Sequence, residues 1–288
     1  MLDRCTFPAI GSPATVALSG GPDSSALAAL AVHHGLRIDA VHVHHGLRSD
    51  ADRDAQAAAD VAERLGVRCR VERVHLSDGP NLEERARQAR VEVLGLEAMT
   101  GHTLDDQAET VVLALLRGAG ARGLAAMRSG HRHPILGLRR SETRALCDEL
   151  DLRPVDDPTN DDPRFRRNRV RHEIIPLLDD VAERDVSVLL ARAARWLRED
   201  DDLLDSLADD LDPTDAATLV SAPRPVARRA IRRWLAVDGR PPDSATVERV
   251  IEVAAGTAVA CDAGAGRRVA RTGGRLRLAS TRRDGPSE

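Results

Sequence analysis

Ser19-Gly-Gly-Pro-Asp-Ser24 lies between an apolar run, Ala14–Leu18, and a helical pattern that begins at Ser25. A strand, a glycine-rich turn and a helix start form a phosphate-binding arrangement. Backbone N–H groups converge in the turn, and the helix N-terminus adds partial positive charge. Glycine removes the Cβ atoms that would block the close approach of an anion. The stretch therefore predicts a phosphate site, and the plainer alternative is a strand–turn–helix corner with Ser24 as N-cap.

Asp23 in this stretch carries a negative charge that would repel a phosphate. Its presence is explained if a Mg²⁺ ion lies between the carboxylate and the phosphate. The sequence has no Gly-x-x-x-x-Gly-Lys-Ser/Thr, so this is not the common P-loop. The pattern resembles the Ser-Gly-Gly-x-Asp-Ser loop of the N-type ATP pyrophosphatases. That resemblance implies cleavage of ATP between its α and β phosphates and adenylation of an oxygen on the substrate.

The composition gives the limits of size and charge. The 288 residues allow one large domain or two modest ones. Hydrophobic residues make up 42% but aromatic residues only 1%, so the core must be built from Ala, Val and Leu. The formal net charge of -4 gives no global nucleic-acid signature. All 42 basic residues are Arg, so phosphate contacts must come from Arg, His or backbone N–H groups.

The four cysteines, Cys5, Cys69, Cys147 and Cys261, are far apart and form no Cys-x-x-Cys or Cys/His metal spacing. Four free thiols in a reducing compartment are expected. Met1–Ile10 contains no apolar segment typical of a signal peptide, and no run is long enough to span a membrane. We therefore expect a cytoplasmic protein without membrane contacts. The oligomeric state is not fixed by the sequence, and a homodimer is compatible with it.

Strand and helix patterns alternate through the first half of the chain. The expected strands are Ala14–Leu18, Ile38–His44, Val67–Val74 and Leu96–Thr100. The expected helices are Ser24–His33, Asp50–Leu65, Leu82–Leu94 and Leu104–Leu116. Repeated strand–helix–strand units predict an α/β fold with a doubly wound, mostly parallel, Rossmann-like sheet. Ligands of such sheets bind beyond the strand C-termini, where the strand order switches.

This alternation breaks near Leu150. Arg153–Arg171 is rich in Pro, Asp, Asn and Arg and is expected to be a loop or arm. From Val186 the pattern is helical, and Ala258–Ala279 suggests a small hairpin. We expect a catalytic domain over residues 1–178 and a smaller, mainly helical domain with a small C-terminal hairpin over 179–281. Residues 282–288 are expected to be a disordered tail.

A second candidate site is Gly101-His-Thr-Leu-Asp-Asp-Gln-Ala-Glu-Thr110, which follows an expected strand and opens a helix. Asp106 and Glu109 are three residues apart and share one helix face. Two carboxylates there repel each other unless a cation lies between them, and this cation is either Mg²⁺ or an ammonium group. The structural alternative is that acidic residues in a first helical turn favour the helix dipole.

Two further motifs carry weaker signals. Arg87 and Arg90 lie three apart on one expected helix face, and a solvated basic face is their simplest interpretation. His42-Val-His-His-Gly-Leu-Arg48 ends the second expected strand. Its histidines are candidates for turn residues near a nucleotide rather than for a metal cluster, because carboxylate partners are not close in sequence.

A fifth segment, Asp157–His172, is dense in arginine and contains one aromatic residue, Phe165. Guanidinium groups with one ring suit backbone phosphates and a stacked base, and a solvated loop is the alternative. The arginines are Arg164, Arg166, Arg167, Arg169 and Arg171. If this segment does not hold RNA, the next candidates are Arg228, Arg229, Arg232 and Arg233 in the helical region.

These five segments occur in one order, followed after the fourth by Leu116-Arg-Gly-Ala-Gly-Ala-Arg-Gly-Leu124. The set resembles the tRNA(Ile)-lysidine synthases over Val16–Leu178, and more loosely beyond. The resemblance implies a C–N bond-forming ligase that modifies the wobble cytidine of an isoleucine tRNA with a CAU anticodon. ATP adenylates the C2 oxygen of that base, and the side-chain amine of free L-lysine then displaces AMP to give lysidine. The further C-terminal domain of longer members is expected to be absent.

The resemblance also implies roles for the candidate residues. Asp23 would hold Mg²⁺, Asp106 and Glu109 would bind lysine, and Arg87 and Arg90 would neutralise developing negative charge. These five are the expected catalytic residues. The expected nucleotide contacts are Ser19, Gly20, Gly21, Pro22, Asp23, Ser24 and His102. The expected substrate contacts are Asp106, Glu109, Arg166, Arg167, Arg169 and Arg171.

Two features depart from the family pattern. Val91 stands where the family usually has an aromatic residue, and the stretch from Val91 to Gly101 is short, which can shift Arg87 and Arg90. The alternatives are a tRNA-thiolating enzyme of the same class, which would need paired cysteines, and an amidotransferase-type synthetase, which would need an ammonia source. A catalytically inactive RNA-binding relative is a third, and it would need none of Asp23, Asp106 and Glu109.

Overall fold

The computed structural model describes residues 1–44, 51–74, 82–156 and 161–280. The chain divides into two compact units, Met1–Arg198 and Glu199–Glu288. The expected tail over 282–288, most of the His42–Arg48 motif and residues 157–160 of the Asp157–His172 segment lie outside the described residues. Within the described part of the chain, no helix combines the length and hydropathy that a membrane span requires.

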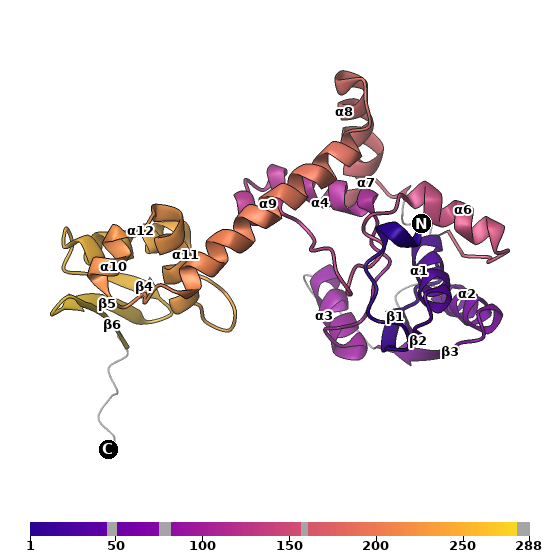
Figure 1. The fold of residues 1–288 in the computed structure, drawn as a ribbon, viewed down its shortest axis with the longest axis horizontal. Coiled ribbons are helices and arrows are strands. Elements are labelled where there is room, and N and C mark those ends of the chain that lie inside the picture. The colour runs from indigo at the N-terminus through magenta and orange to yellow at the C-terminus, as the bar shows by residue number, and fades with distance from the viewer. Residues whose placement is uncertain (45–50, 75–81, 157–160, 281–288) are drawn as a thin grey trace, which may run out of the picture. The chain divides into compact units, whose positions relative to one another are not determined.

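A parallel three-stranded sheet organises the first unit. Its strands are β1 (Pro13–Ala17), β2 (Arg37–His44) and β3 (Arg68–Arg73), in the order β1-β2-β3. The free edge of β1 is joined by Met99, which pairs in parallel with Val16. The three strands lie in the order β3-β2-β1 (Figure 1). Met99 extends this order beyond β1, so the strand order reverses beside β1. This reversal is the switch point that the doubly wound pattern predicted.

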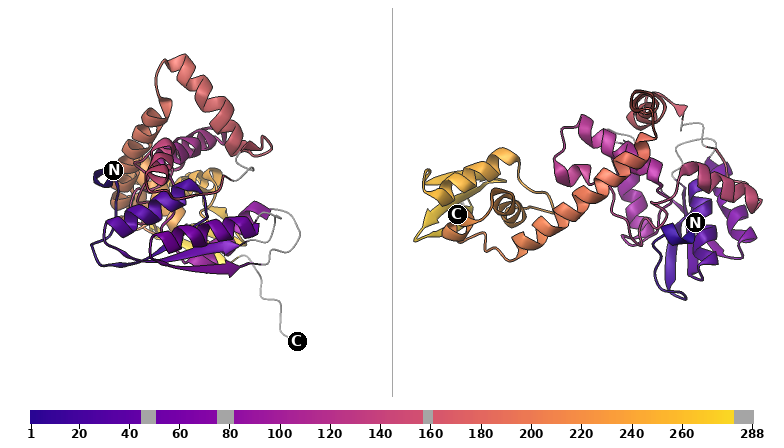
Figure 2. Two further views of the ribbon diagram at one scale, coloured as in Figure 1. Left: turned by 90° about the vertical axis from the view of Figure 1, so that its right-hand side faces the viewer. Right: turned by 45° about the horizontal axis from the view of Figure 1, so that its top comes forward.

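The helices of the first unit follow from this topology. α1 (Pro22–His33) and α2 (Ala51–Arg64) connect strands that run in one direction across the sheet, so right-handed crossovers place both on one face. Figure 2 shows these indigo and purple helices together on one side of the strands. α3 (Leu82–Leu94) leads back across the sheet to Met99 and so belongs to the other face. The α/β, doubly wound prediction is confirmed.

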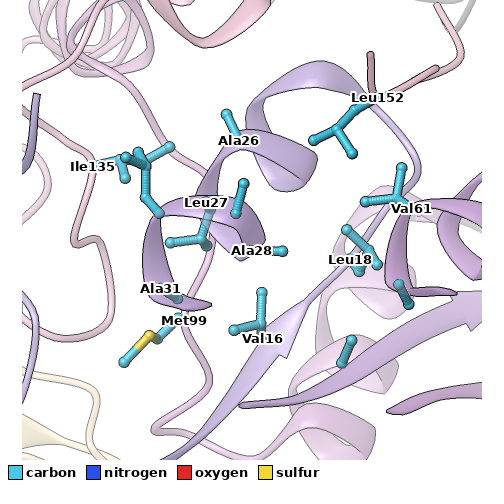
Figure 3. Packing of buried hydrophobic residues seen from close by; sticks show 14 of the residues in the cluster. Val16, Leu18, Ala26, Leu27, Ala28, Ala31, Val61, Met99, Ile135 and Leu152 are labelled. Atoms are coloured by element: carbon cyan, nitrogen blue, oxygen red, sulfur yellow. The ribbon is translucent and has the colours of Figure 1, made fainter. Parts of the chain in front are cut away.

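The core of the first unit is built from small aliphatic side chains, as the composition requires. Val16 and Leu18 of the first strand region pack with Leu27 of α1, Val61 of α2 and Ile135 (Figure 3). All five are almost completely buried. α1 is apolar on every side because it lies between the sheet and α6 (Arg140–Glu149), which explains its run of alanines.

Two local predictions in the first unit are wrong. The expected strand Leu96–Thr100 is reduced to the single bridge at Met99, because Gly95 turns with a φ of +77° and Leu96 is exposed. The expected loop Arg153–Arg171 becomes helical within its second half. α7 (Arg166–Arg169) continues into a π-helical turn, η3 (Val170–Ile174), because Val170 packs against Ala108 and Val112 of α4 (Leu104–Leu116).

The remaining helices of this unit follow the parallel sheet along the chain. They are α4 (Leu104–Leu116), α5 (Ala121–Leu124), α8 (Ile175–Ala182) and the first part of α9 (Val186–Asp209). A short 3₁₀ turn, Leu2–Arg4, opens the chain. α9 begins in the first unit and ends in the second.

The second unit packs helices against a small antiparallel sheet. Its helices are α10 (Ala216–Ser221), α11 (Arg224–Trp234) and α12 (Ser244–Ala255). Its strands are β4 (Ala260–Gly264), β5 (Arg267–Thr272) and β6 (Arg275–Ser280), in the order β4-β5-β6. The expected hairpin is therefore a three-stranded sheet, because β5 pairs with both neighbours and its Val269 joins the helical core.

Candidate active site

The Ser19–Ser24 loop is closed by its own serine hydroxyls. Ser24 Oγ donates to the carbonyl of Gly21 at 3.0 Å and accepts the N–H of Ser19 at 3.1 Å. The two serine hydroxyls contact each other at 2.9 Å. Gly21 is the N-cap of α1 without a side-chain cap, and the first helical hydrogen bond runs from Ser25 N–H to its carbonyl. The N–H groups of Asp23 and Ser24 thus have no acceptor within the helix and suit an anion.

Two glycines allow the backbone of this region to come close together. Gly20 has a φ of +89°, and a Cβ there would lie 2.6 Å from the carbonyl oxygen of Asp54 in α2. A Cβ on Gly101 would lie 2.8 Å from the backbone of both Asp23 and Ser24. The ends of β1 and of the Met99 segment therefore touch at the switch point, and they bring the two predicted sites together.

Asp23 is held by two donors from α6. The hydroxyl of Thr143, which is fully buried, donates to Oδ1 of Asp23, and Nε of Arg140 donates to Oδ2 at 3.4 Å. Burial raises the pKa of Asp23, and these donors offset that effect only in part. A cation on this carboxylate would favour its ionised form.

Asp106 caps the helix in which it lies and also faces the site. Its Oδ2 accepts from the N–H and the hydroxyl of Thr103, in a capping box that opens α4. Its Oδ1 accepts from Arg140 at 2.8 Å and from Arg167 at 3.1 Å. Burial opposes ionisation, but the charges of Arg140 and Arg167 hold the pKa of Asp106 below its usual value. The helix-cap interpretation and the cation-site interpretation therefore apply to the same residue.

Glu109 is the most deeply buried charge of the site, with 1% of its surface exposed. Three guanidinium groups surround it: Arg167 at 2.6 Å, Arg171 at 2.7 Å and Arg140 at 3.2 Å. A buried carboxylate needs such partners because an isolated buried charge is strongly unfavourable. Glu109 thus lies where cations bind, and arginine side chains supply those cations in this structure.

Arg140 is a central residue of the site that the sequence interpretation did not identify. It opens α6, and its backbone N–H donates to Asp105 at 2.7 Å. Its side chain contacts Asp23, Asp106 and Glu109 at once. Basic residues are unfavourable in the first turn of a helix, so an arginine at this position was a signal that could have been noticed. Thr143 lies one turn later on the same helix. It was not identified, because no local sequence pattern marks it.

The arginine-rich segment divides into two groups. Arg167 and Arg171 point into the site, as described for Asp106 and Glu109. Arg164 pairs with Asp162, and Arg169 pairs with Glu173 on the surface. Arg166 is exposed and has no ion pair with another described residue. Phe165 is 45% exposed beside it.

The other predicted residues lie on α3 and at the start of α1. Arg90 lies on α3 and is exposed, and its charge contributes to the lowered pKa of His102, which burial mainly causes. The side chain of Arg87 lies outside the description, although its backbone belongs to α3. Pro22 takes the first position of α1, where its missing N–H is not needed. Val91 follows on α3 and is partly buried.

His102 belongs to a partly buried polar trio. Oγ1 of Thr100 lies 2.7 Å from Nδ1 of His102 and 2.8 Å from Nδ1 of His133, and the rings meet edge to face. Burial lowers the pKa of both rings, and that of His133 falls to about 4. The hydroxyl of Thr100 also donates to the carbonyl of Arg132 at 3.2 Å, so its oxygen can accept an N–H from each ring. His133 was not identified from the sequence.

His42 lies nearer to the loop than the sequence pattern indicated. Its Nδ1 is 2.9 Å from the carbonyl of Leu18, and burial lowers its pKa. A neutral ring that donates there links the end of β2 to the start of the Ser19–Ser24 loop. Among the described residues, no three His, Cys, Asp or Glu side chains gather in a metal-binding group. Asp23, alone of the acids on the loop, fits a Mg²⁺ ion that would be shared with phosphate oxygens.

Comparison with known proteins assigns both parts of the chain. The family model of the PP-loop domain matches residues 6–178, and that of the TilS substrate binding domain matches residues 215–277. The tRNA(Ile)-lysidine synthase of Nocardia farcinica is 45% identical over 249 residues, which cover 81% of this chain and 78% of that protein. The enzyme of the same name from Mycobacterium tuberculosis is 41% identical over 254 residues, covering 78% and 75%.

The fold also occurs among solved structures. The U34-tRNA thiolase NcsA of Methanococcus maripaludis superposes with a TM-score of 0.51 at 21% identity, over 66% of this chain and 73% of that one. At this identity the likeness concerns the fold alone. The extent of the PP-loop match and the identities to the curated relatives show that this chain belongs to the tRNA(Ile)-lysidine synthase family of PP-loop ATP pyrophosphatases.

Proposed function

We propose that this chain ligates L-lysine to the wobble cytidine of an isoleucine tRNA with a CAU anticodon. ATP adenylates the C2 oxygen of the base and releases pyrophosphate. The side-chain amine of lysine then forms a bond to C2, and the bond from C2 to the adenylated oxygen breaks to release AMP. The observation that carries the proposal is the meeting of Asp23 with Asp106 and Glu109 around Arg140.

The Ser19–Ser24 loop supports a role in holding the pyrophosphate part of ATP. Its convergent N–H groups and the start of α1 favour an anion. Asp23 would hold Mg²⁺ there, and the ion would supply neutralisation of phosphate charge. His102, in its neutral form, would contact the nucleotide from the opposite loop, next to Thr100.

Asp106 and Glu109 support a site for the ammonium group of lysine. Both carboxylates are buried and pair with arginine side chains, which supports a cation-binding role. We assign Arg87 and Arg90 on α3 to the neutralisation of negative charge that develops in the adenylation step. Arg167 and Arg171 would orient the two carboxylates.

The tRNA would span more of the chain than the ATP site does. Residues 1–178 would form the catalytic domain and residues 179–281 the tRNA-binding domain, with Arg166 and Arg169 contacting RNA from the catalytic part. We expect the protein to act in the cytoplasm, where tRNA, ATP and lysine are available together.

The activity is tested by incubating the protein with ATP, Mg²⁺, labelled lysine and purified isoleucine tRNA of CAU anticodon. Label in the RNA, with equal amounts of AMP and pyrophosphate, is the expected result. Methionine tRNA, which has the same anticodon, serves as the control for substrate choice. Label from a sulfur donor but not from lysine would instead support the thiolation alternative.

A further inference from the structure

Arg140 connects the two halves of the candidate site. Its Nε faces Asp23 on the Ser19–Ser24 loop at 3.4 Å, while its two terminal nitrogens contact Asp106 at 2.8 Å and Glu109 at 3.2 Å. Among the arginines with described contacts in this site, it is the one that reaches both the nucleotide side and the lysine side. Its contact with the loop is the longest of the three.

The charges of this cluster balance without any substrate. Three carboxylates, Asp23, Asp106 and Glu109, face three guanidiniums, Arg140, Arg167 and Arg171. An ammonium group that enters this balanced cluster adds uncompensated positive charge in a buried place. Lysine therefore needs one guanidinium to turn away before Asp106 and Glu109 can accept its amine.

The nucleotide supplies the charge that could draw that guanidinium away. The triphosphate of ATP would bring several negative charges to the loop beside Asp23, next to Nε of Arg140. Guanidinium groups bind phosphate oxygens in a forked geometry, and about a quarter of the Arg140 side chain is exposed. Arg167 and Arg171 make no described contact with the loop.

We propose that Arg140 is a positioning residue that couples the two substrates. Nucleotide binding draws its guanidinium toward the phosphates, and this movement frees Asp106 and Glu109 for the lysine ammonium. The inference rests on the proposed function, since it takes Asp106 and Glu109 as the lysine site. Lysine then binds after ATP, which keeps the amine from the site until the nucleotide is in place.

The coupling is measured by titrating L-lysine calorimetrically into the full-length protein, alone and saturated with α,β-methylene-ATP and Mg²⁺. This analogue resists cleavage between the α and β phosphates. Wild-type protein should bind lysine about tenfold more tightly with the analogue, in the range usual for coupled sites. By reciprocity, saturating lysine should tighten the binding of the analogue by the same factor.

Substitutions at Arg140 and at a control residue test whether Arg140 carries the coupling between the two substrates. Arg140→Gln should bind lysine without nucleotide as well as wild type binds it with the analogue, so the ratio falls toward one. Arg144→Gln is the matched control, because Arg144 lies one turn later on α6 and pairs with exposed Asp156. It should keep the wild-type ratio. If Arg140→Gln does not fold, Arg140→Lys retains the charge but loses the fork, and it should still reduce the ratio.

Three results would overturn the inference. Equal lysine affinity with and without the analogue in wild type would remove the coupling, while label transfer to tRNA would leave the proposed function standing. An Arg140→Gln variant with the full ratio would assign the coupling elsewhere. No lysine binding in either state, in protein that transfers label to tRNA, would show that lysine does not bind at Asp106 and Glu109 before the tRNA is adenylated. Absence of label transfer by wild type is the separate failure of the proposed function.

Discussion

Gly101 lies directly against the backbone of Asp23: a Cβ built on Gly101 would be 2.8 Å from the carbonyl carbon and oxygen of Asp23. The same Cβ would be 2.8 Å from the amide nitrogen of Ser24. These atoms belong to backbone, so no side chain can rotate away to make room. The two loops at the switch point therefore fix each other, and with them the position of the Ser19–Ser24 loop relative to the start of α4.

Replacement of Gly101 by Ala should push these loops apart. Overpacking of this kind destabilises a protein by about 1–3 kcal/mol, and displacement of Asp23 and Ser24 should weaken nucleotide binding. Urea unfolding and calorimetric binding of α,β-methylene-ATP measure the two effects. Gly120→Ala is the control, since a Cβ there would meet nothing within 4 Å. Unchanged stability and unchanged nucleotide affinity in Gly101→Ala would show that the close contact of Gly101 with the Asp23 backbone is not required for nucleotide binding.

Asp23→Asn should abolish pyrophosphate release while the fold persists. The amide keeps the shape of the side chain and an acceptor for Thr143, but it loses the charge that would hold Mg²⁺. Because burial raises the pKa of Asp23, removal of the charge should not reduce the free energy of unfolding. Circular dichroism and pyrophosphate release are measured on the same sample. Normal pyrophosphate release from the folded variant would exclude the metal role.

Asp106→Asn and Glu109→Gln should each weaken the apparent affinity for lysine by at least about tenfold. A hydrogen bond to a charged group contributes about 1.5–3 kcal/mol. Adenylation of the tRNA should survive better than lysine transfer, and the two steps are separated by measuring AMP-labelled tRNA with and without lysine. An equal fall in both steps would indicate that these carboxylates bind a metal rather than lysine.

The same two variants should differ in stability. Glu109 is buried among Arg140, Arg167 and Arg171, and removal of its charge leaves three guanidiniums with less compensation. Breaking a buried pair costs about 3–5 kcal/mol. Asp106→Asn retains an acceptor for the capping box and should cost less. Urea unfolding of both variants compares them, and a smaller loss for Glu109→Gln would contradict this account.

The trio of Thr100, His102 and His133 should make stability depend on pH. The pKa of His133 is lowered to about 4 by burial, by His102 and by Arg132, and the unfolded ring titrates near 6.5. The neutral ring therefore contributes stability that is present above about pH 6.5 and is lost as the pH falls toward about 4. Below that pH both states are protonated, and no further loss arises from this ring.

His133→Gln tests this origin of the pH dependence. The variant cannot titrate, so its free energy of unfolding should fall less between about pH 7 and about pH 4 than that of wild type. Urea unfolding across this range gives the comparison. His131→Gln, which changes an exposed neighbouring ring, is the control and should follow wild type. Parallel curves for His133→Gln and wild type would assign the effect to other groups.

The sequence alone was sufficient to predict the structural elements that are encoded by patterns within a few neighbouring residues. The Ser19–Ser24 loop, the first three strands and α4 were predicted because glycine positions, apolar periodicity and acidic helix starts are visible within a few residues. Asp23, Asp106 and Glu109 were likewise identified by position, and the structure brings them together around one guanidinium.

What the sequence did not reveal depends on contacts distant along the chain. Arg140 and Thr143 contact Asp23 only because α6 packs against α1. No local sequence pattern predicts that packing. His133 likewise reaches His102 through a turn of the chain that has no periodic signal. The expected loop around Arg167 became helical because Val170 finds a buried place beside α4, which is a tertiary effect.

Arg166 and Arg167, adjacent in sequence, should have separate roles. Arg166 is exposed, whereas Arg167 contacts Asp106 at 3.1 Å and Glu109 at 2.6 Å. Arg166→Ala should weaken tRNA binding and reduce the log–log salt slope by about one unit, because one phosphate contact is lost. Arg167→Ala should leave that slope nearly unchanged and alter the lysine dependence of the reaction instead.

Filter binding of tRNA across a salt series distinguishes the two variants. Arg164→Ala is a suitable control, because Arg164 is already paired with Asp162 and should give a smaller change than Arg166. Helix α11 offers the alternative RNA site, but Arg228 and Arg229 there pair with Glu248 and Asp201. An unchanged slope for Arg166→Ala would therefore direct attention to Arg232, which is exposed on the same helix and has no ion pair with another described residue. Since the net charge of the chain is negative, tRNA must be held by such individual arginines rather than by a general positive field.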